Sequence, residues 1–210
     1  MGQVGEDRSI YVVDDDREIR LSLSFQLSTL GYSCTPFCRA ADFLGALEHL
    51  KPGCILLDIR MAGMDGIEML AALQELGVEW PVVIMTGHAD VPVAVAAMKG
   101  GAVELLEKPF EEALLMAALD KAFGTLSERL ERSSHFAAIH GKLKTLSPRE
   151  RDVLAHLTAG EPNKLIADAL GLSVRTVEMH RANLLPKLGV RSTAEAAVFG
   201  LHLGRLGTSV

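Results

Sequence analysis

The sequence of 210 residues predicts an α/β domain built on a five-stranded, doubly wound parallel sheet, followed by a small all-α domain of four helices. Up to about residue 124, short β-branched apolar runs alternate with longer helical stretches, which is typical of βα units, and only helical patterns follow. Residues 1–124 carry nine Lys and Arg against nineteen Asp and Glu, whereas residues 125–210 carry twelve against eight. This asymmetry favours two domains and a polyanion, such as nucleic acid, as the partner of the second.

The first domain is expected to contain five βα repeats. The strands are expected near 9–13, 33–36, 54–58, 82–86 and 103–106, and the helices near 17–30, 40–50, 66–76, 91–99 and from 110 onward. Glycines separate these segments, as turns and helix C-caps require. Such a chain predicts a sheet of flavodoxin-like strand order.

The helix from residue 110 is expected to continue to about residue 132, because Leu and Ala recur there at three- and four-residue spacing. It is either simply the last core helix or also an extension that serves signalling between domains or dimerisation. Residues 133–144 are expected to form a linker, because their polar residues are mixed and include Gly141.

The second domain is expected to begin with a helix capped by Ser147 and Glu150, with Pro148 at the first helical position. Helices are expected near 148–159, 163–170, 174–187 and 192–203. The second and third are joined by a short turn that contains Gly171 and ends in the N-cap Ser173, which is a helix-turn-helix pattern.

Polar side chains follow four of the predicted strands. Asp14 and Asp15 follow the first, Asp58 and Thr86 end the third and fourth, and Lys108 follows the fifth. Ligands of such sheets bind beyond the carboxyl ends of the strands, so these side chains are expected to share one crevice. Carboxylates, a hydroxyl and an ammonium there suit a divalent cation and a phosphoryl group.

Asp58 is the candidate nucleophile, because a carboxylate can attack phosphorus and form an acyl phosphate. Asp14 and Asp15 would bind Mg²⁺ together with Asp58. Each residue alone has a simpler interpretation, as a helix cap, a turn residue or a solvated lysine. Their joint placement favours the site, whereas Asp16 is interpreted only as a first-turn acid favoured by the helix dipole.

Four motifs carry a resemblance to a known family: Val13-Asp14-Asp15-Asp16, Leu57-Asp58-Ile59-Arg60-Met61, Met85-Thr86-Gly87-His88 and Glu107-Lys108-Pro109-Phe110. In this order, they resemble the receiver domain of two-component response regulators, over about residues 8–124. The resemblance implies that Asp15 coordinates Mg²⁺ directly, that Asp14 acts partly through water, and that the backbone carbonyl of Arg60 adds a ligand. It also implies that Lys108 and Thr86 contact the phosphoryl group and that the Lys108–Pro109 bond is cis.

Two residues depart from the family pattern. Ala62 stands where the family usually has Pro, and Leu105 stands where many relatives have a Tyr or Phe that moves inward on activation. These departures leave the stiffness of the loop after Asp58 and the aromatic switch in question.

Residues 146–206 resemble a LuxR-type output domain, joined to the receiver by a helical extension and linker at 125–145, and the whole chain is similar to the FixJ branch of the nitrate-regulator family. Residues 174–183 would then be the DNA recognition helix. Contacts with DNA phosphates are expected from Lys164, Arg175, Thr176, Arg181 and Lys187. Base contacts are expected from Glu178, Met179 and Ala182, with the alternative that Glu178 pairs with Arg175 or Arg181.

The predicted function is a transcription factor whose DNA binding and dimerisation are controlled by Mg²⁺-dependent phosphorylation of Asp58 by a histidine kinase. Its expected partners are the kinase, double-stranded promoter DNA, a second copy when phosphorylated, and, as a further candidate, RNA polymerase. The dimer is expected to form through the fourth helix, fifth strand and fifth helix, and release of a masked recognition helix is an alternative route. No enzyme activity beyond slow self-dephosphorylation is expected.

Two other functions compete with this prediction. The first is an atypical regulator that binds DNA without phosphorylation, which Ala62 and Leu105 keep open. The second is a Mg²⁺-dependent phosphohydrolase with an Asp-x-Asp pair, which Glu18 disfavours because that pattern continues with Thr or Val.

The remaining sequence features indicate a soluble, cytoplasmic protein. No signal peptide or membrane-length apolar run is evident. Three cysteines and the scattered histidines of the second half show no metal-ligand spacing.

Overall fold

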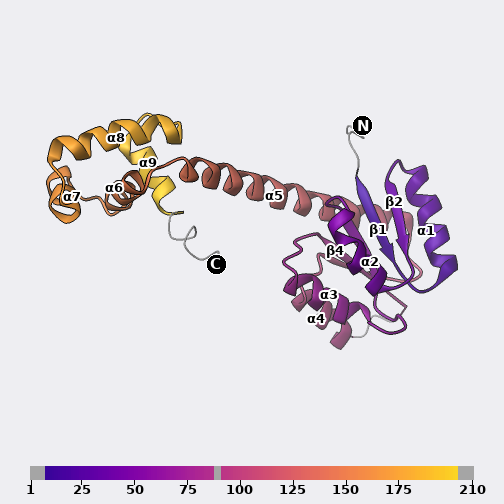
Figure 1. Ribbon diagram of the computed structural model, residues 1–210. Coiled ribbons are helices and arrows are strands. Elements are labelled where there is room, and N and C mark those ends of the chain that lie inside the picture. The colour runs from indigo at the N-terminus through magenta and orange to yellow at the C-terminus, as the bar shows by residue number, and fades with distance from the viewer. Residues whose placement is uncertain (1–7, 88–90, 203–210) are drawn as a thin grey trace. The chain divides into compact units, whose positions relative to one another are not determined.

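The computed structural model describes residues 8–87 and 91–202, so His88 and residues 203–206 of the predicted output domain lie outside the described residues. The chain divides into two compact units, Met1–Leu130 (unit 1) and Glu131–Val210 (unit 2), and each is described by itself (Figure 1).

Unit 1 contains a five-stranded parallel sheet with the order β2-β1-β3-β4-β5. The strands are β1 (Ser9–Val13), β2 (Ser33–Phe37), β3 (Cys54–Asp58), β4 (Val82–Thr86) and β5 (Glu104–Glu107). All four neighbouring pairs are parallel. The predicted doubly wound sheet of flavodoxin-like order is therefore confirmed.

Helices cover both faces of this sheet (Figure 1). They are α1 (Arg17–Thr29), α2 (Ala40–Ala46) with the short 3₁₀ helix η1 (Leu47–His49), α3 (Gly66–Glu75), α4 (Val91–Lys99) and α5 (Glu112–Lys144). Side chains alternate along each strand, so Ile10 and Val12 join a core with α1 and α5, while Tyr11 and Val13 join a core with α2, α3 and α4. Burial of both faces explains the continuous apolar runs of the central strands.

The segment 133–144, expected as a linker, is helical: α5 continues through it to Lys144. Gly124 and Gly141 do not end the helix, although each costs about 1 kcal/mol relative to Ala. Buried residues flank both glycines: Phe123 and Leu126 lie in the core of unit 1, and Ile139 and Leu143 lie in the core of unit 2. The last turns of α5 are thus part of that unit's packing, which the polar character of the segment concealed.

Unit 2 also contains the four predicted helices: α6 (Pro148–Thr158), α7 (Asn163–Leu170), α8 (Val174–Leu188) and α9 (Thr193–Gly200). Ser147 and Glu150 form the predicted capping box of α6. Gly171 ends α7 in the left-handed conformation, and Ser173 caps α8. Val177, Leu184 and Leu188 of α8 are buried in the core.

Candidate functional site

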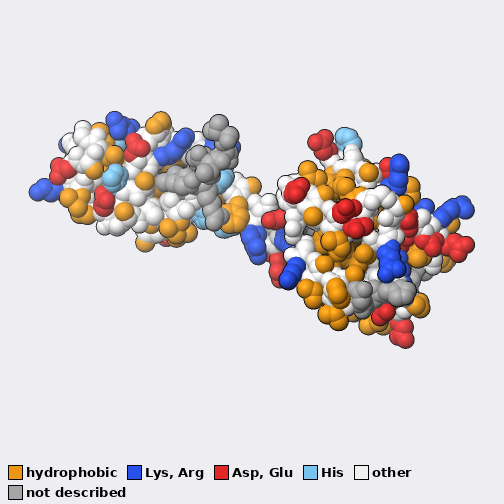
Figure 2. All heavy atoms as spheres, turned by 90° about the horizontal axis from the view of Figure 1, so that it is seen from below, with side chains coloured by type: hydrophobic (Ala, Val, Ile, Leu, Met, Phe, Trp, Pro, Cys, Tyr) orange, Lys and Arg blue, Asp and Glu red, His pale blue; other side chains and the backbone are white. Residues whose placement is uncertain are grey.

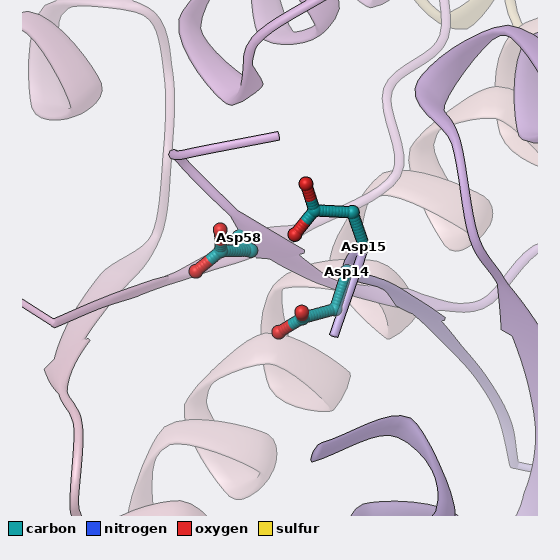
Figure 3. Close-up of side chains that lie close together, drawn as sticks. All are labelled: Asp14, Asp15 and Asp58. Carbon is teal, nitrogen blue, oxygen red and sulfur yellow. The ribbon is translucent and has the colours of Figure 1, made fainter. Parts of the chain in front are cut away.

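Three carboxylates meet at the carboxyl end of the sheet (Figure 3). Asp58 is the last residue of β3, and Asp14 and Asp15 follow β1, the neighbouring strand. One carboxylate oxygen from each of the three lies within 4.8 Å of the others. The parallel register therefore brings together residues that are more than forty positions apart in the sequence.

Lys108 lies between two of these carboxylates. Its Nζ donates hydrogen bonds to Asp14 Oδ2 and Asp58 Oδ1, each at 2.6 Å. The side chain of Asp14 is 1% exposed and that of Lys108 is 16% exposed, so the ion pairs are largely withdrawn from water. Asp14 and Asp58 are buried and need such a cation, since unpaired buried charges are costly, whereas Asp15 is exposed.

Burial and pairing shift the pKa values of this cluster in defined directions. Burial raises the pKa of Asp58, and the nearby Asp14 carboxylate raises it further, while Lys108 and the backbone N–H of Arg60 oppose this effect. Burial would lower the pKa of Lys108, but its hydrogen bonds to Asp14 and Asp58 outweigh burial and raise it. Lys108 therefore remains a cation at neutral pH.

The local backbone holds the acids in place. The N–H of Asp16 donates to Asp14 Oδ1 at 2.8 Å, and Arg20 donates to the Asp14 carbonyl at 2.7 Å. Asp16 itself accepts from the N–H of Glu18 and caps α1, which agrees with its interpretation as a helix-start acid.

Thr86 and Lys108 are brought to the same edge by the pairing of β4 and β5. Thr86 is buried at the end of β4, and its carbonyl accepts a hydrogen bond from the backbone N–H of Lys108 at 2.7 Å. The Lys108–Pro109 bond is cis, as the resemblance implied.

The two departures from the family pattern have clear structural settings. The backbone N–H of Ala62 donates to Asp15 Oδ2 at 3.0 Å, a bond that a proline could not make. Leu105 is half-buried on β5 and packs against the core shared with α2, α3 and α4.

The donor set fits Mg²⁺. Mg²⁺ binds one or a few carboxylates and keeps several waters, and the three acids offer oxygens close enough to share one ion. The ammonium of Lys108 already occupies a cationic position beside Asp14 and Asp58. The position of the Arg60 carbonyl as a further ligand stays a prediction.

The residues expected to contact DNA fall into two groups in unit 2. Lys164, Arg175, Glu178, Met179 and Ala182 are exposed. Thr176 is half-buried, and its hydroxyl is hydrogen-bonded to Ser173. Among the residues that the structure describes, no ion pair joins Glu178 to Arg175 or Arg181.

Arg181 and Lys187 are instead engaged within the unit. Arg181 bonds to Asn163 and Thr193, and Lys187 pairs with Glu150. The sequence alone did not indicate that these three acceptors are partners of Arg181 and Lys187. Only Glu150 had a local signal, the capping box, and that signal does not reveal its ionic partner 37 positions away.

Comparison with known proteins assigns both units. Residues 10–120 match the response regulator receiver domain, and residues 144–199 match the bacterial regulatory proteins of the LuxR family. The transcriptional regulatory protein FixJ of Bradyrhizobium diazoefficiens is 43% identical over 197 residues, which cover 94% of this chain and 96% of that protein. The chain is a two-component response regulator of the FixJ type.

Other relatives agree with this family. The C4-dicarboxylate transport transcriptional regulatory protein DctR of Rhodobacter capsulatus is 38% identical over 90% of this chain and 97% of that protein. The solved structure of the response regulator StyR has a TM-score of 0.80 at 36% identity, covering 92% of this chain and 98% of that one. Full-length FixJ from B. japonicum has a TM-score of 0.59 at 42% identity, covering 97% and 100%.

The regulator therefore combines a receiver domain with a DNA-binding domain, which makes it a phosphorylation-regulated transcription regulator rather than an enzyme. The domain pair implies a histidine kinase and DNA as its partners. In the part of the chain that the structure describes, no helix is long and apolar enough to cross a membrane.

Proposed function

We propose that Asp58 is the phosphoacceptor of the receiver domain and that Asp14, Asp15, Thr86 and Lys108 serve its phosphorylation. The observation that carries this proposal is the cluster itself: Lys108 Nζ lies 2.6 Å from both Asp14 and Asp58, and Asp15 completes the acidic triad. These groups come from three different strand ends, an arrangement that helix capping alone does not require.

In the proposed reaction, a carboxylate oxygen of Asp58 attacks the phosphorus of a phosphohistidine on the kinase. The new O–P bond replaces the N–P bond, and the imidazole leaves with its electron pair. Lys108 then balances the charge of a phosphoryl oxygen, and the Thr86 hydroxyl donates a hydrogen bond to another. Phosphoryl transfer of this kind depends mainly on positioning and charge neutralisation.

Asp14, Asp15 and Asp58 would hold Mg²⁺, with the Arg60 carbonyl as a further ligand. The ion supplies charge neutralisation for the incoming phosphoryl oxygens. Within the chain, the backbone N–H of Ala62 orients Asp15, and the N–H of Asp16 orients Asp14. Water admitted to the same site would hydrolyse the acyl phosphate slowly and reset the switch.

The exposed residues of α7 and α8 support a DNA-reading surface. Lys164 and Arg175 would contact phosphates, and Glu178, Met179 and Ala182 would face base edges, where Glu178 can accept from cytosine N4. Promoter DNA is the proposed ligand, and RNA polymerase remains a further candidate partner.

An apolar stripe on α4 supports a homodimer of the phosphorylated receiver. Val91, Val95 and Met98 recur at helical spacing and are exposed, Val91 at 75%. Figure 2 views unit 1 from the side on which α3 and α4 lie in Figure 1, and apolar side chains gather there among charged ones. A two-fold dimer would match the symmetry of a palindromic operator.

The experiment that tests this function is intact mass measured after incubation with acetyl phosphate, with and without Mg²⁺. We expect a Mg²⁺-dependent gain of one phosphoryl group that hydroxylamine removes, in the unmodified chain and in Asp16→Asn but not in Asp58→Asn. Asp16→Asn is a matched control, because Asn also caps helices.

DNA affinity measured on the same samples separates the proposal from a phosphorylation-independent regulator. We expect phosphodonor to tighten DNA binding by the unmodified chain and to leave Asp58→Asn unchanged. Unchanged affinity in both proteins would favour the phosphorylation-independent regulator.

A further inference from the structure

Side chains of the helix α8 are hydrogen-bonded to the first turns of three neighbouring helices, α6, α7 and α9. Arg181, in the middle of α8, donates through Nη1 to Asn163 Oδ1 and through Nη2 to Thr193 Oγ1, the latter at 2.6 Å. Asn163 is the first residue of α7, and Thr193 is the first residue of α9. One guanidinium thus joins three helices.

Lys187 makes the second attachment, near the end of α8. Its Nζ lies 2.8 and 2.7 Å from the two carboxylate oxygens of Glu150, in the first turn of α6. Glu150 is only 3% exposed, and it also accepts a hydrogen bond from the backbone N–H of Ser147 at 2.7 Å. A buried carboxylate of this kind is costly to leave without its cation.

The charged ends of Arg181 and Lys187 lie at the N-termini of α6, α7 and α9, although helix N-termini favour anions and not cations. Arg181 and Lys187 are nevertheless held at such ends, each by side-chain acceptors of matching geometry. The two attachments are six residues apart, about 9 Å along the helix axis, so together they fix both the position and the tilt of α8. Lys187 is itself partly exposed, with 39% of its side chain accessible, so its engagement rests on the contact of Nζ with Glu150. Lys164 and Arg175 are exposed as well.

We infer that Arg181 and Lys187 are positioning residues, which hold the recognition helix in the orientation that reads DNA, and that they do not contact DNA phosphates. This assignment replaces the phosphate contacts that the sequence predicted for these two residues. It rests on the DNA-reading surface proposed above.

Replacement of Glu150, the carboxylate partner of Lys187, should change DNA affinity in opposite directions for a phosphate-contacting lysine and for a positioning lysine. If Lys187 contacted phosphate, Glu150→Gln would release it and remove a negative charge, so DNA binding would tighten. If Lys187 positions α8, the same variant weakens binding, by about tenfold for one lost charged hydrogen bond. Glutamine keeps the capping box and the side-chain volume. Asp152→Asn, an exposed acid of the same helix, is the matched control and is expected to bind at least as tightly as the unmodified chain.

Salt dependence supplies an independent readout, measured with a labelled duplex that the unmodified full chain selects from a random-sequence pool. Each phosphate contact contributes about 0.9 to the slope of log affinity against log salt concentration. We expect Arg181→Met and Lys187→Met to weaken binding with an unchanged slope. Lys164→Met and Arg175→Met are expected to reduce the slope by about 0.9 each. A reduced slope in the first pair, or tighter or unchanged binding by Glu150→Gln, would overturn the inference.

Two controls keep the outcome interpretable. Circular dichroism melts set an assay temperature at which every variant is folded. If Glu150→Gln does not fold, Arg181→Lys replaces it as the test, since lysine keeps the positive charge but cannot bridge the two acceptors Asn163 and Thr193. Its matched control is Arg175→Lys, and equal affinities of these two lysine variants would also overturn the inference. If Lys164→Met and Arg175→Met leave binding unchanged, the proposed DNA surface fails, and this result is distinct from a failure of the positioning role.

Discussion

The backbone N–H of Ala62 donates a hydrogen bond to the carboxylate of Asp15 at 3.0 Å. Ala62 is the residue that departs from the proline usual in response regulators, and a proline has no N–H to donate. The departure that suggested a looser loop therefore gives Asp15 an additional partner, and the loop after β3 is tied to the loop after β1.

Replacement of Ala62 tests whether the hydrogen bond from its N–H holds the Asp15 carboxylate in the orientation that binds Mg²⁺. We expect Ala62→Pro to weaken Mg²⁺ binding by about tenfold, because partners that orient metal ligands typically contribute at least that much. Titration calorimetry with Mg²⁺ measures the affinity. Ala62→Ser keeps the N–H and is the matched control, and equal affinities of the two variants would show that the bond does not orient Asp15.

Replacement of Lys108 tests the charge balance of the acidic cluster. We expect Lys108→Met, without Mg²⁺, to lower the free energy of unfolding of the receiver by about 2 kcal/mol, because Asp14 and Asp58 lose their buried cation. Fluorescence of Trp80, the single tryptophan and part of the receiver core, reports this unfolding.

Added Mg²⁺ should then stabilise the Lys108→Met variant more than the unmodified chain, since the ion replaces the missing positive charge. Equal stabilisation of the two proteins would contradict the view that Lys108 balances the site. A variant of the exposed Lys99, Lys99→Met, is the control for loss of a lysine on the same domain.

The ion pair of Glu150 and Lys187 predicts a pH dependence of the output domain. Burial raises the pKa of Glu150, but the hydrogen bonds from Lys187 and Ser147 outweigh burial, so its pKa lies below the ordinary value. A depressed carboxyl pKa stabilises the fold above the unfolded pKa, about 4.3, and this contribution is lost as the pH falls through the folded value.

The difference in unfolding free energy between the unmodified chain and Glu150→Gln should therefore be largest near neutral pH and should shrink below about pH 4. Denaturant unfolding followed by circular dichroism at several pH values measures it, because Trp80 belongs to the other unit. A difference that stays constant down to pH 3 would argue against the ion pair as its source.

Two glycines of the receiver predict opposite effects of added methyl groups. A Cβ on Gly66 would lie 2.4 Å from the carbonyl oxygen of Asp58 and 2.8 Å from Ile59 Cα, so backbone next to the site must move. We expect Gly66→Ala to destabilise the receiver by about 2 kcal/mol and to slow phosphorylation of Asp58.

Gly124, in the helix α5, has no atom within 4 Å of an added Cβ. Gly124→Ala should stabilise the receiver by about 0.5–1 kcal/mol, because alanine restricts the unfolded chain and favours the helix. Trp80 fluorescence during denaturant unfolding measures both variants, and a loss of stability in Gly124→Ala would contradict the open environment of this position.

Much of this regulator follows from local sequence. Short β-branched apolar runs predict the strands, and the polar residues at their ends predict the cluster of Asp14, Asp15, Asp58, Thr86 and Lys108. Capping residues such as Ser147 and Ser173 mark helix starts, because their hydroxyls bond to backbone groups within three residues. These signals depend on neighbours in the chain, so they can be recognised before any fold is known.

The tertiary structure decided the features that depend on distant partners. The segment 133–144 is helical because Ile139 and Leu143 find a core to enter, which no local pattern reveals. Arg181 and Lys187 resemble exposed phosphate contacts in the sequence, yet their partners lie 12 to 37 positions away. The sequence by itself determined the chemistry at the strand ends, since parallel strands bring their carboxyl ends to one edge of the sheet. Only the tertiary structure determined which cations of α8 are hydrogen-bonded within unit 2, since such a bond depends on distance in space and not on separation along the chain.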